Sequence, residues 1–198
     1  MAEETLTKEL ILDTAETVLR KYGLAKTNMS DIARAIGVSH AALYRHFENK
    51  AMLQKAVVDR WLSGVFEPLA QAAKEANSID SKLYNWLNAL RMFKLERSRK
   101  DPELFAMYAR LVGENPDLLE MHMEQLLEQL QLIIEEGVAV GTFKCQDARQ
   151  AAIGVFMATT RFHHAAFSSE WEKPDAESRF EAVWQTLLYG LHDSSVKK

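Results

Sequence analysis

Residues 29–47, with the sequence MSDIARAIGVSHAALYRHF, have the residue types and the spacing of a structure that could bind DNA. Ala33, Gly37 and Leu43 stand at positions i, i+4 and i+10, as a helix-turn-helix requires. A small residue at Ala33 lets the two helices cross closely, and Gly37 supplies the positive φ of the turn between them. Leu43 closes the crossing from the second helix. That helix is then free to lie in a DNA major groove.

The other reactive side chains do not form a catalytic or metal-binding pattern. His163 and His164 are adjacent, so on a helix they would point about 100° apart and would rarely bind one ion together. His122 has no carboxylate or imidazole one helical turn away, and Cys145 is the single cysteine. The sequence contains no nucleophile elbow, glycine-rich phosphate loop or zinc-ligand spacing. We therefore expect no enzyme activity, no metal and no cofactor.

Composition and charge limit the class of protein further. The chain has 198 residues, of which 47% are hydrophobic and 26% charged, as in a globular protein of one or two domains. No apolar stretch approaches the roughly 20 residues of a membrane span, and the first residues lack the features of a secretory signal. With one cysteine, these observations predict a cytoplasmic protein without membrane contact.

The net charge of −4 is unevenly distributed along the chain. Residues 1–60 hold nine basic and eight acidic side chains, whereas residues 61–198 hold 15 and 20. The acidity therefore lies in the C-terminal part. A nearly neutral N-terminal part can still bind DNA through a local basic face.

The hydrophobic periodicity predicts an all-α fold of about nine helices, and the presence of only four Pro and eight Gly argues against an all-β fold. We expect two domains, residues 1–60 and residues 61–198, with the divide inside a long fourth helix that joins them. The helices are expected at about 7–22, 29–36, 40–47 and 50–74, after 78, from 101, and at 117–140, 147–167 and 174–191.

The N-terminal part closely resembles the DNA-binding domain of the tetracycline-repressor (TetR) family. The stretch ILDTAETVLRKYG, residues 11–23, is similar to the first helix of that family. The resemblance covers about residues 8–62, while residues 63–198 match only in length and helical pattern. It implies a DNA-binding helix-turn-helix at 28–47 and a C-terminal domain that binds an effector and dimerises. The positions that carry it are Thr27, Ala33, Gly37, Val38, Ser39, Leu43, Tyr44, His46, Phe47, Lys50 and Leu53.

The resemblance implies a set of contacts to the DNA backbone. Tyr44 and His46 resemble the phosphate-contacting pair of the family, and Thr27 is similar to another such contact. Ser39 begins the second motif helix, where its hydroxyl can cap the helix and reach a phosphate. Lys50 begins the next helix, where the helix dipole and the ammonium both favour a phosphate. Such contacts set register and carry little sequence information.

Base reading is expected from the exposed side of the second motif helix. His40 could bond a purine edge, and Ala41 or Ala42 could touch a thymine methyl group. Arg45 could pair with guanine or with a phosphate. The alternatives are that His40 is exposed without a role and that Arg45 is only a solvated charge.

The resemblance places an effector pocket among the middle helices. Soft and aromatic side chains there would suit an apolar or aromatic effector, although each could equally be an ordinary core residue. The candidates are Trp86, Met92, Phe93, Phe105, Tyr108, Met123, Phe143 and Met157.

In the TetR family the last two helices of each subunit form a four-helix dimer interface. Two DNA-binding domains (heads) related by a twofold axis can recognise both halves of a palindrome, whereas one head can recognise only one half. The alternative for each candidate is the core of a single subunit. The candidates are Phe156, Thr160, His163, Phe167, Phe180, Val183, Trp184, Leu187, Leu188 and Leu191.

The sequence therefore favours a TetR-type transcriptional regulator of the repressor kind. It would bind a palindromic double-stranded DNA operator as a homodimer and leave it when a small, hydrophobic or aromatic effector binds. The alternative keeps the fold but not the switch: a DNA-bound adaptor that recruits a protein partner without a small-molecule effector.

Overall fold

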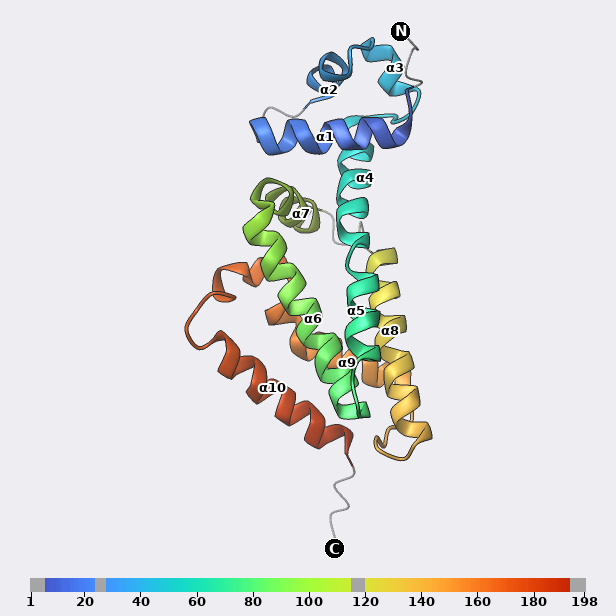
Figure 1. The fold of residues 1–198 in the computed structure, drawn as a ribbon, viewed down its shortest axis with the longest axis vertical. Helices are drawn as coiled ribbons and strands as arrows, with labels where there is room; N and C mark the ends of the chain where they lie inside the picture. The colour runs from blue at the N-terminus through green and yellow to red at the C-terminus, as the bar shows by residue number, and fades with distance from the viewer. Residues whose placement is uncertain (1–5, 24–27, 115–119, 193–198) are drawn as a thin grey trace, which may run out of the picture. The chain divides into compact units, whose positions relative to one another are not determined.

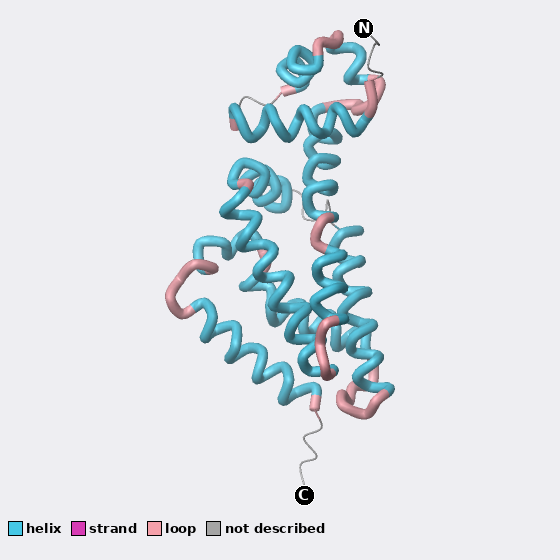
Figure 2. Tube along the Cα trace, viewed as in Figure 1, coloured by secondary structure: helices cyan, strands magenta, loops and turns pink. Residues whose placement is uncertain are grey.

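The computed structural model describes residues 6–23, 28–114 and 120–192 (Figure 1). Across these ranges it contains ten α-helices, two short 3-10 helices and no strand (Figure 2). The chain divides into two compact units, residues 1–63 with 99–119 and residues 64–98 with 120–198. In the described part of the chain, no helix is both long and apolar enough to cross a membrane. The all-α expectation is confirmed, with one helix more than the nine anticipated.

The first unit contains the helix-turn-helix and three helices that support it. Its α1 packs against α2, α4 and α7, and α2 packs against α3. The predicted helices at 7–22 and 29–36 are confirmed to within a residue, whereas the third helix is shorter than expected. The helices of this unit are α1 (Lys8–Tyr22), α2 (Met29–Ile36), α3 (His40–Tyr44), α4 (Lys50–Ser63) and α7 (Pro102–Glu114).

Local capping explains where the helices of the first unit begin. The side chain of Thr7 accepts a hydrogen bond from the Leu10 amide at 3.1 Å, which starts α1. Asn28 accepts from the Asp31 amide at 3.0 Å and starts α2. Each cap satisfies an amide that the first helical turn leaves without an intrahelical acceptor. The N-cap of α2 is therefore Asn28.

The predicted long helix at 50–74 is instead two helices, so the expectation of a continuous joining helix is wrong. α4 ends at Ser63 and α5 (Phe66–Lys74) follows after a turn at Gly64 and Val65. The Ser63 hydroxyl donates to the Arg60 carbonyl at 2.7 Å, which competes with the helical pattern, and glycine is a poor helix former. The division between the two units falls at this break.

The helix α7 was expected in the C-terminal domain, but it belongs to the first unit. It packs on α1 and α4. The rings of Trp61 on α4 and Tyr108 on α7 have centroids 5.7 Å apart. At the start of the same helix, Asp101 accepts from Arg20 Nε at 2.9 Å. An aromatic contact with α4 and an ion pair with α1 thus hold α7 within the first unit.

The second unit is a bundle in which α8 and α9 pack along each other. The predicted helix at 147–167 ends early, because the hydroxyls of Thr159 and Thr160 donate to carbonyls three and four residues back and the chain continues as 3-10 turns. The elements are α5, α6 (Ile79–Lys100), α8 (Glu120–Ala139), α9 (Ala148–Thr159), η3 (Thr160–Phe162), η4 (Ala165–Glu170) and α10 (Ala176–Leu191).

One glycine in the second unit is required by packing. Gly137 lies on α8 against the fully buried Phe143, and a Cβ at this position would stand 2.2 Å from Phe143 Cδ2 and 2.8 Å from Ile79 Cγ2. No such separation is tolerated between carbon atoms. The close approach lets the loop after α8 fold its phenylalanine into the core beside Trp86 and Phe180.

Candidate nucleic-acid interface

The crossing of α2 and α3 has the geometry that the sequence predicts. Leu43 is completely buried, and Ala33 retains 4% of its surface. Gly37 has φ of 83° and ψ of 26°, in the left-handed region, and its amide donates to the Ala33 carbonyl at 2.9 Å. Val38 donates to the same carbonyl at 3.0 Å. The turn therefore needs a glycine and presents α3 at a fixed angle to α2.

Five of the expected DNA-contacting side chains are exposed around α3, among them Tyr44. Ser39 accepts from the Ala42 amide at 3.3 Å and so caps the helix, as predicted. His40, Ala41 and Arg45 are exposed. A hydroxyl, an imidazole and a guanidinium thus stand within one short helix and its ends, with a methyl group between them. These groups can supply hydrogen bonds to base edges or phosphates.

Ala42 is a correction to the expected base-reading set. It retains 7% of its surface and lies among the buried side chains of the head. Successive residues on an α-helix are turned by about 100°, so Ala42 stands next to Leu43 on the inward side of this short helix. Its methyl group packs in the core and cannot touch a thymine. Ala41 is exposed and stays the candidate for that contact.

The side chains proposed for phosphate contact lie at the two ends of α3 and the start of α4. Tyr44 is 43% exposed, and its ring centroid lies 4.9 Å from that of His40, edge to face. His46 is half-buried. Lys50 is half-buried in the first turn of α4, where the adjacent Asn49 accepts from the Met52 amide at 2.9 Å. Thr27 lies outside the described residues.

The structure adds a candidate that the sequence did not suggest. Lys8 is exposed in the first turn of α1, and its Nζ lies 6.0 Å from the centroid of the Phe47 ring. Phe47 directly follows His46, so an ammonium from α1 stands beside the end of α3. The two segments are far apart in the sequence, and only the fold brings them together.

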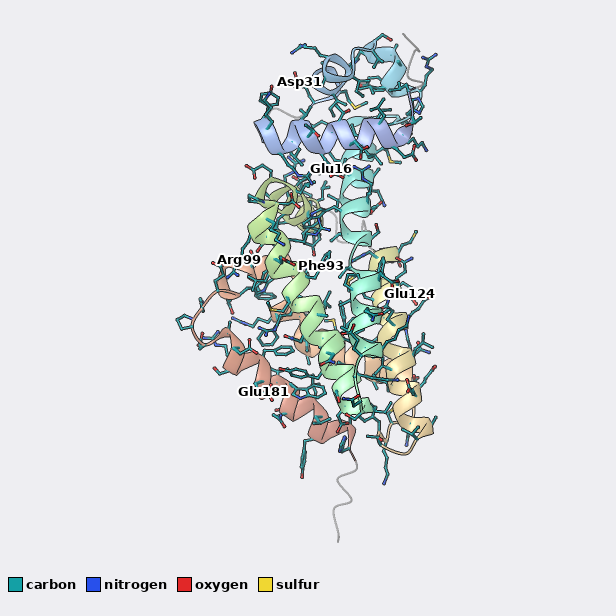
Figure 3. All side chains as sticks on the ribbon, in the orientation of Figure 1. Glu16, Asp31, Phe93, Arg99, Glu124 and Glu181 are labelled. Carbon is teal, nitrogen blue, oxygen red and sulfur yellow. The ribbon has the colours of Figure 1, made fainter. Side chains whose placement is uncertain are left out.

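An ion-pair network fixes the helices behind this surface. Arg60 on α4 donates to the carboxylates of both Glu16 and Asp13 on α1, the latter at 2.8 Å. Arg20 on α1 donates to Glu16 as well, at 3.1 Å. Figure 3 labels Glu16 on α1. The shared carboxylate therefore ties α1 to α4, the helix that begins at Lys50.

The eight side chains expected to line an effector pocket are divided between the two units. Phe105 and Tyr108 lie in the first unit, in contact with Trp61. The other six belong to the second unit, where they are either buried core residues or lie on its surface. Trp86 and Phe143 are fully buried, Phe93 is half-buried (Figure 3), and Met92, Met123 and Met157 are 44%, 36% and 63% exposed.

The residues expected at a dimer interface are also divided by their burial. Five of them lie inside the core of a single chain and expose almost nothing: Phe156, His163, Phe180, Trp184 and Leu191. The other five keep part of their surface: Thr160, Phe167, Val183, Leu187 and Leu188. Beside exposed polar and charged residues such as Gln150, Arg179 and Gln185, the exposed faces of α9 and α10 carry small residues and two large ones that are mainly apolar. The small and the large, mainly apolar residues are Gly154, Met157 and Ala158 on α9, and Ala182, Thr186, Tyr189 and Gly190 on α10.

The second unit has a surface hollow whose volume, including the part open to solvent, is about 380 Å³. Arginine and aromatic side chains dominate its wall. Arg161 holds Glu170 with two hydrogen bonds of 2.7 Å, and Arg179 holds Asp175 at 2.6 Å. The lining residues are Arg91, Leu95, Arg161, Phe162, Glu170, Trp171, Ala176 and Arg179.

Two family models match the chain. The model described as "Bacterial regulatory proteins, tetR family" matches residues 11–57, and "Tetracyclin repressor-like, C-terminal domain" matches residues 80–184. The chain belongs to the TetR family of transcriptional regulators. The first model covers the head described above, and the second covers most of the second unit together with α7.

Relatives of this TetR-family regulator include proteins from several bacteria. The HTH-type transcriptional regulator TtgR of Pseudomonas putida is 38% identical over 37% of this chain, a match that spans 35% of TtgR. The HTH-type transcriptional repressor KstR2 of Mycolicibacterium smegmatis is 26% identical, over 91% of this chain and 86% of its own. The nucleoid occlusion factor SlmA of Colwellia psychrerythraea is 25% identical, over 91% and 92%.

The fold of the regulator is also shared with solved structures. FadR of Bacillus subtilis, solved in complex with stearoyl-CoA, superposes with a TM-score of 0.64 over 94% of this chain and 100% of its own, at 20% identity. At this identity the likeness shows a common fold.

Proposed function

We propose that this TetR-family regulator is a homodimeric repressor that binds a palindromic DNA operator and releases it when a small apolar or aromatic effector binds. The observation that carries the proposal is the surface of α3. Exposed hydrogen-bonding side chains surround this helix, while the Leu43 side chain beneath it is fully buried. A rigid support with exposed donors is what groove recognition requires.

In this proposal the side chains of the head have separate roles. Tyr44, His46 and Lys50 bind phosphates and fix the register, and Lys8 adds a further positive charge at the end of α3. His40 and Arg45 read base edges, and Ala41 contacts a thymine methyl group. The head is nearly neutral overall, so affinity depends on this local placement of donors.

Dimerisation is proposed through the exposed faces of α9 and α10. Gly154 and Ala158 on α9 lie one turn apart and are both exposed, as are Thr186 and Gly190 on α10. Small residues at such spacing let helices of two subunits approach closely. Met157 and Tyr189 supply the large apolar contacts, with 63% and 74% of their surfaces exposed in the single chain.

Repression and its release by an effector are supported by the relatives. KstR2 is named a transcriptional repressor, and FadR of B. subtilis shares the fold and was solved with stearoyl-CoA. We propose that effector binding in the second unit changes the spacing of the two heads, so that they no longer fit adjacent half-sites.

One relative supports the alternative function. SlmA is named a nucleoid occlusion factor, and its similarity extends over 91% of this chain. In the alternative, this chain would use the same head to bind DNA and would recruit a protein partner without an effector. DNA release by a small molecule distinguishes the two, because only the repressor proposal requires it.

The test starts from DNA upstream of the protein's own gene. Anisotropy of this labelled DNA measures its affinity at two salt concentrations. We expect specific binding that weakens steeply with salt, because phosphate contacts release counterions. If that DNA and a random duplex bind equally weakly, self-regulation is wrong, and a selection of bound genomic fragments then asks whether any operator exists. Failure of that selection contradicts the proposal.

A further inference from the structure

The first unit contains a small hollow between α1, α2, α4 and α7 (Figure 1), which we call the first-unit hollow. Its volume, including the part open to solvent, is about 280 Å³. Apart from Asn28, Lys50 and Gln54, the side chains that line it are buried and apolar, Leu19 and Met107 among them. Asn28 is exposed and Lys50 is half-buried, so the hollow opens at the starts of α2 and α4.

One buried polar side chain stands in this apolar wall. Gln54 on α4 keeps 6% of its surface, and its side-chain oxygen accepts from Arg110 Nη2 on α7 at 3.4 Å. The side-chain nitrogen is buried, and among the described residues it has no hydrogen-bond partner. The reverse orientation of the amide would set its hydrogens against the guanidinium, so Arg110 fixes which end is the oxygen.

The amide nitrogen of Gln54 is the group that this residue can offer to a ligand. Gln54 lines the first-unit hollow, whereas Arg110, which takes its oxygen, does not. A buried donor without an acceptor costs free energy, and an acceptor that enters the hollow would remove that cost. The hollow and the unsatisfied donor are independent observations, and they meet at one side chain.

We propose that the first-unit hollow binds a small neutral carbonyl compound, whose oxygen accepts a hydrogen bond from the Gln54 amide. The apolar wall suits a hydrocarbon body. A charged group is disfavoured, because the buried part of the wall has no side chain to pair with it. A carbonyl oxygen accepts a hydrogen bond without bringing a donor that would need its own acceptor.

The size of the first-unit hollow limits the ligand to a few carbon atoms. Its volume of about 280 Å³ lies just below the roughly 300–1,000 Å³ of typical ligand pockets. Met29 and Met107 stand in its wall, and their unbranched side chains can adjust to the outline of a small ring. A linear or cyclic ketone of this size is therefore the expected occupant.

The first-unit hollow lies at the starts of two helices that position the DNA-binding surface. Lys50, in its wall, begins α4 and is a proposed phosphate contact. Asn28, also in its wall, caps α2 through the Asp31 amide. The site is separate from the effector site proposed in the second unit, so it goes beyond the proposed function.

Two pairs of isosteric probes test the site in the full-length protein without DNA. Cyclopentanone is compared with methylenecyclopentane, and acetophenone with α-methylstyrene, so that within each pair C=O replaces C=CH2. Calorimetry gives the affinities for wild-type protein and Gln54→Leu. In at least one pair, the ratio of ketone affinity to alkene affinity should fall about tenfold in Gln54→Leu, because the donor is lost. Comparing ratios cancels the different hydration of the two probes.

A matched control and a second measurement make the result specific to Gln54. Gln71→Leu, an exposed glutamine on α5, should keep the wild-type ratio. In wild-type protein with ¹⁵N-labelled glutamine side chains, the ketone and not the alkene should shift one amide signal, which Gln54→Leu lacks. Gln54 is the one glutamine that lines the hollow in the described part of the chain. The absence of any ketone-specific shift contradicts the site even if Gln54→Leu does not fold.

Three further results would overturn the proposal: no binding of either ketone, a ratio that Gln54→Leu leaves unchanged, or an equal fall of the ratio in Gln71→Leu. The outcome is separate from that of the proposed function, because no DNA is present. If the ketone binds through Gln54 but no operator is found, the site stands and the repressor proposal fails. If the operator binds but no ketone does, the regulator stands and this site fails.

Discussion

The imidazole ring of His40 lies edge-on to the ring of Tyr44, with centroids 4.9 Å apart, one turn further along α3. The contact joins a side chain proposed to read a base to one proposed to bind a phosphate. It fixes the direction of His40, which is otherwise an exposed side chain on a helix of five residues. Backbone binding and base reading are therefore expected to be coupled through Tyr44.

The coupling predicts different results for two substitutions of Tyr44. Tyr44→Phe keeps the ring contact and loses one hydroxyl in each subunit, so affinity of the dimer should fall by about 1–3 kcal/mol for every sequence alike. Tyr44→Ala also releases His40 and should change the ranking of operator variants. Competition anisotropy with single-base variants measures both. A ranking that Tyr44→Ala leaves unchanged would show that the ring contact has no part in base reading.

The close approach of Gly137 to Phe143 predicts a packing defect. Gly137→Ala gains helix propensity but places a methyl group 2.2 Å from a buried ring, so we expect a net loss of about 1–3 kcal/mol in the free energy of unfolding. Gly113→Ala on α7 is the control, because an added Cβ there meets no described atom within 4 Å. Urea denaturation compares the three proteins. Equal stability of both variants would contradict the packing described for the loop after α8.

The buried lysine predicts that stability rises with pH. Lys94 has a folded pKa of about 7, below its ordinary value of 10.5, so between these values the unfolded chain binds more protons than the folded one. The free energy of unfolding should therefore increase from pH 7 to pH 9, by about 2 kcal/mol. Lys94→Met should be more stable at pH 7 and should show a smaller rise. Urea denaturation at a fixed protein concentration measures this; a rise of equal size in the variant would contradict it.

His122 and His163 extend this dependence to acid. Their folded pKa values of about 3 lie below the ordinary 6.5. The stability that they contribute is complete above pH 6.5 and is lost as the pH falls toward 3. We expect His163→Phe, which removes one titrating imidazole, to weaken the decrease in stability between pH 6.5 and pH 4.5. A decrease as steep as that of the wild-type protein would mean that this imidazole is already charged in the fold.

The exposed faces of α9 and α10 predict where a dimer can be broken. Met157→Glu and Tyr189→Glu place a charge on each face, and burying it between subunits should weaken the dimer about 100-fold or more. Leu132→Glu on α8 is the control, since Leu132 is 64% exposed in the single chain and lies outside the proposed interface. Sedimentation equilibrium gives the association constants. Dimers that resist both substitutions would place the interface elsewhere.

The helix ends, the cap and the helix crossing of the head are predicted well from the sequence. Gly37 ends α2, Ser39 caps α3 and Leu43 fills the crossing, because each role depends on neighbours a few residues away. The prediction for Ala42 is wrong, because a helix of five residues is too short for its hydrophobic periodicity to show which side chains face the core. The helix break after Ser63 is not predicted because the apolar pattern continues through it.

The second unit could not be predicted to the same depth. A methionine or aromatic residue at helical spacing can belong either to the core or to a ligand pocket. Hydrophobic periodicity therefore does not show that Trp86 is fully buried and Met157 exposed. The burial of Lys94 runs against the usual exposure of lysine. It depends on helices that are distant in sequence, and only the three-dimensional structure shows it.

DNA binding by the surface around α3 underlies the proposed function, and a single titration decides whether it occurs there. Wild-type protein, the double variant Tyr44→Ala, His46→Ala and a control, Gln71→Ala on α5, are titrated into the selected operator and a random duplex at two salt concentrations. We predict tight, salt-sensitive operator binding that the double variant weakens about 100-fold, through four lost phosphate contacts per dimer, and that the control retains. Equal affinity of the double variant and the wild-type protein would contradict this prediction.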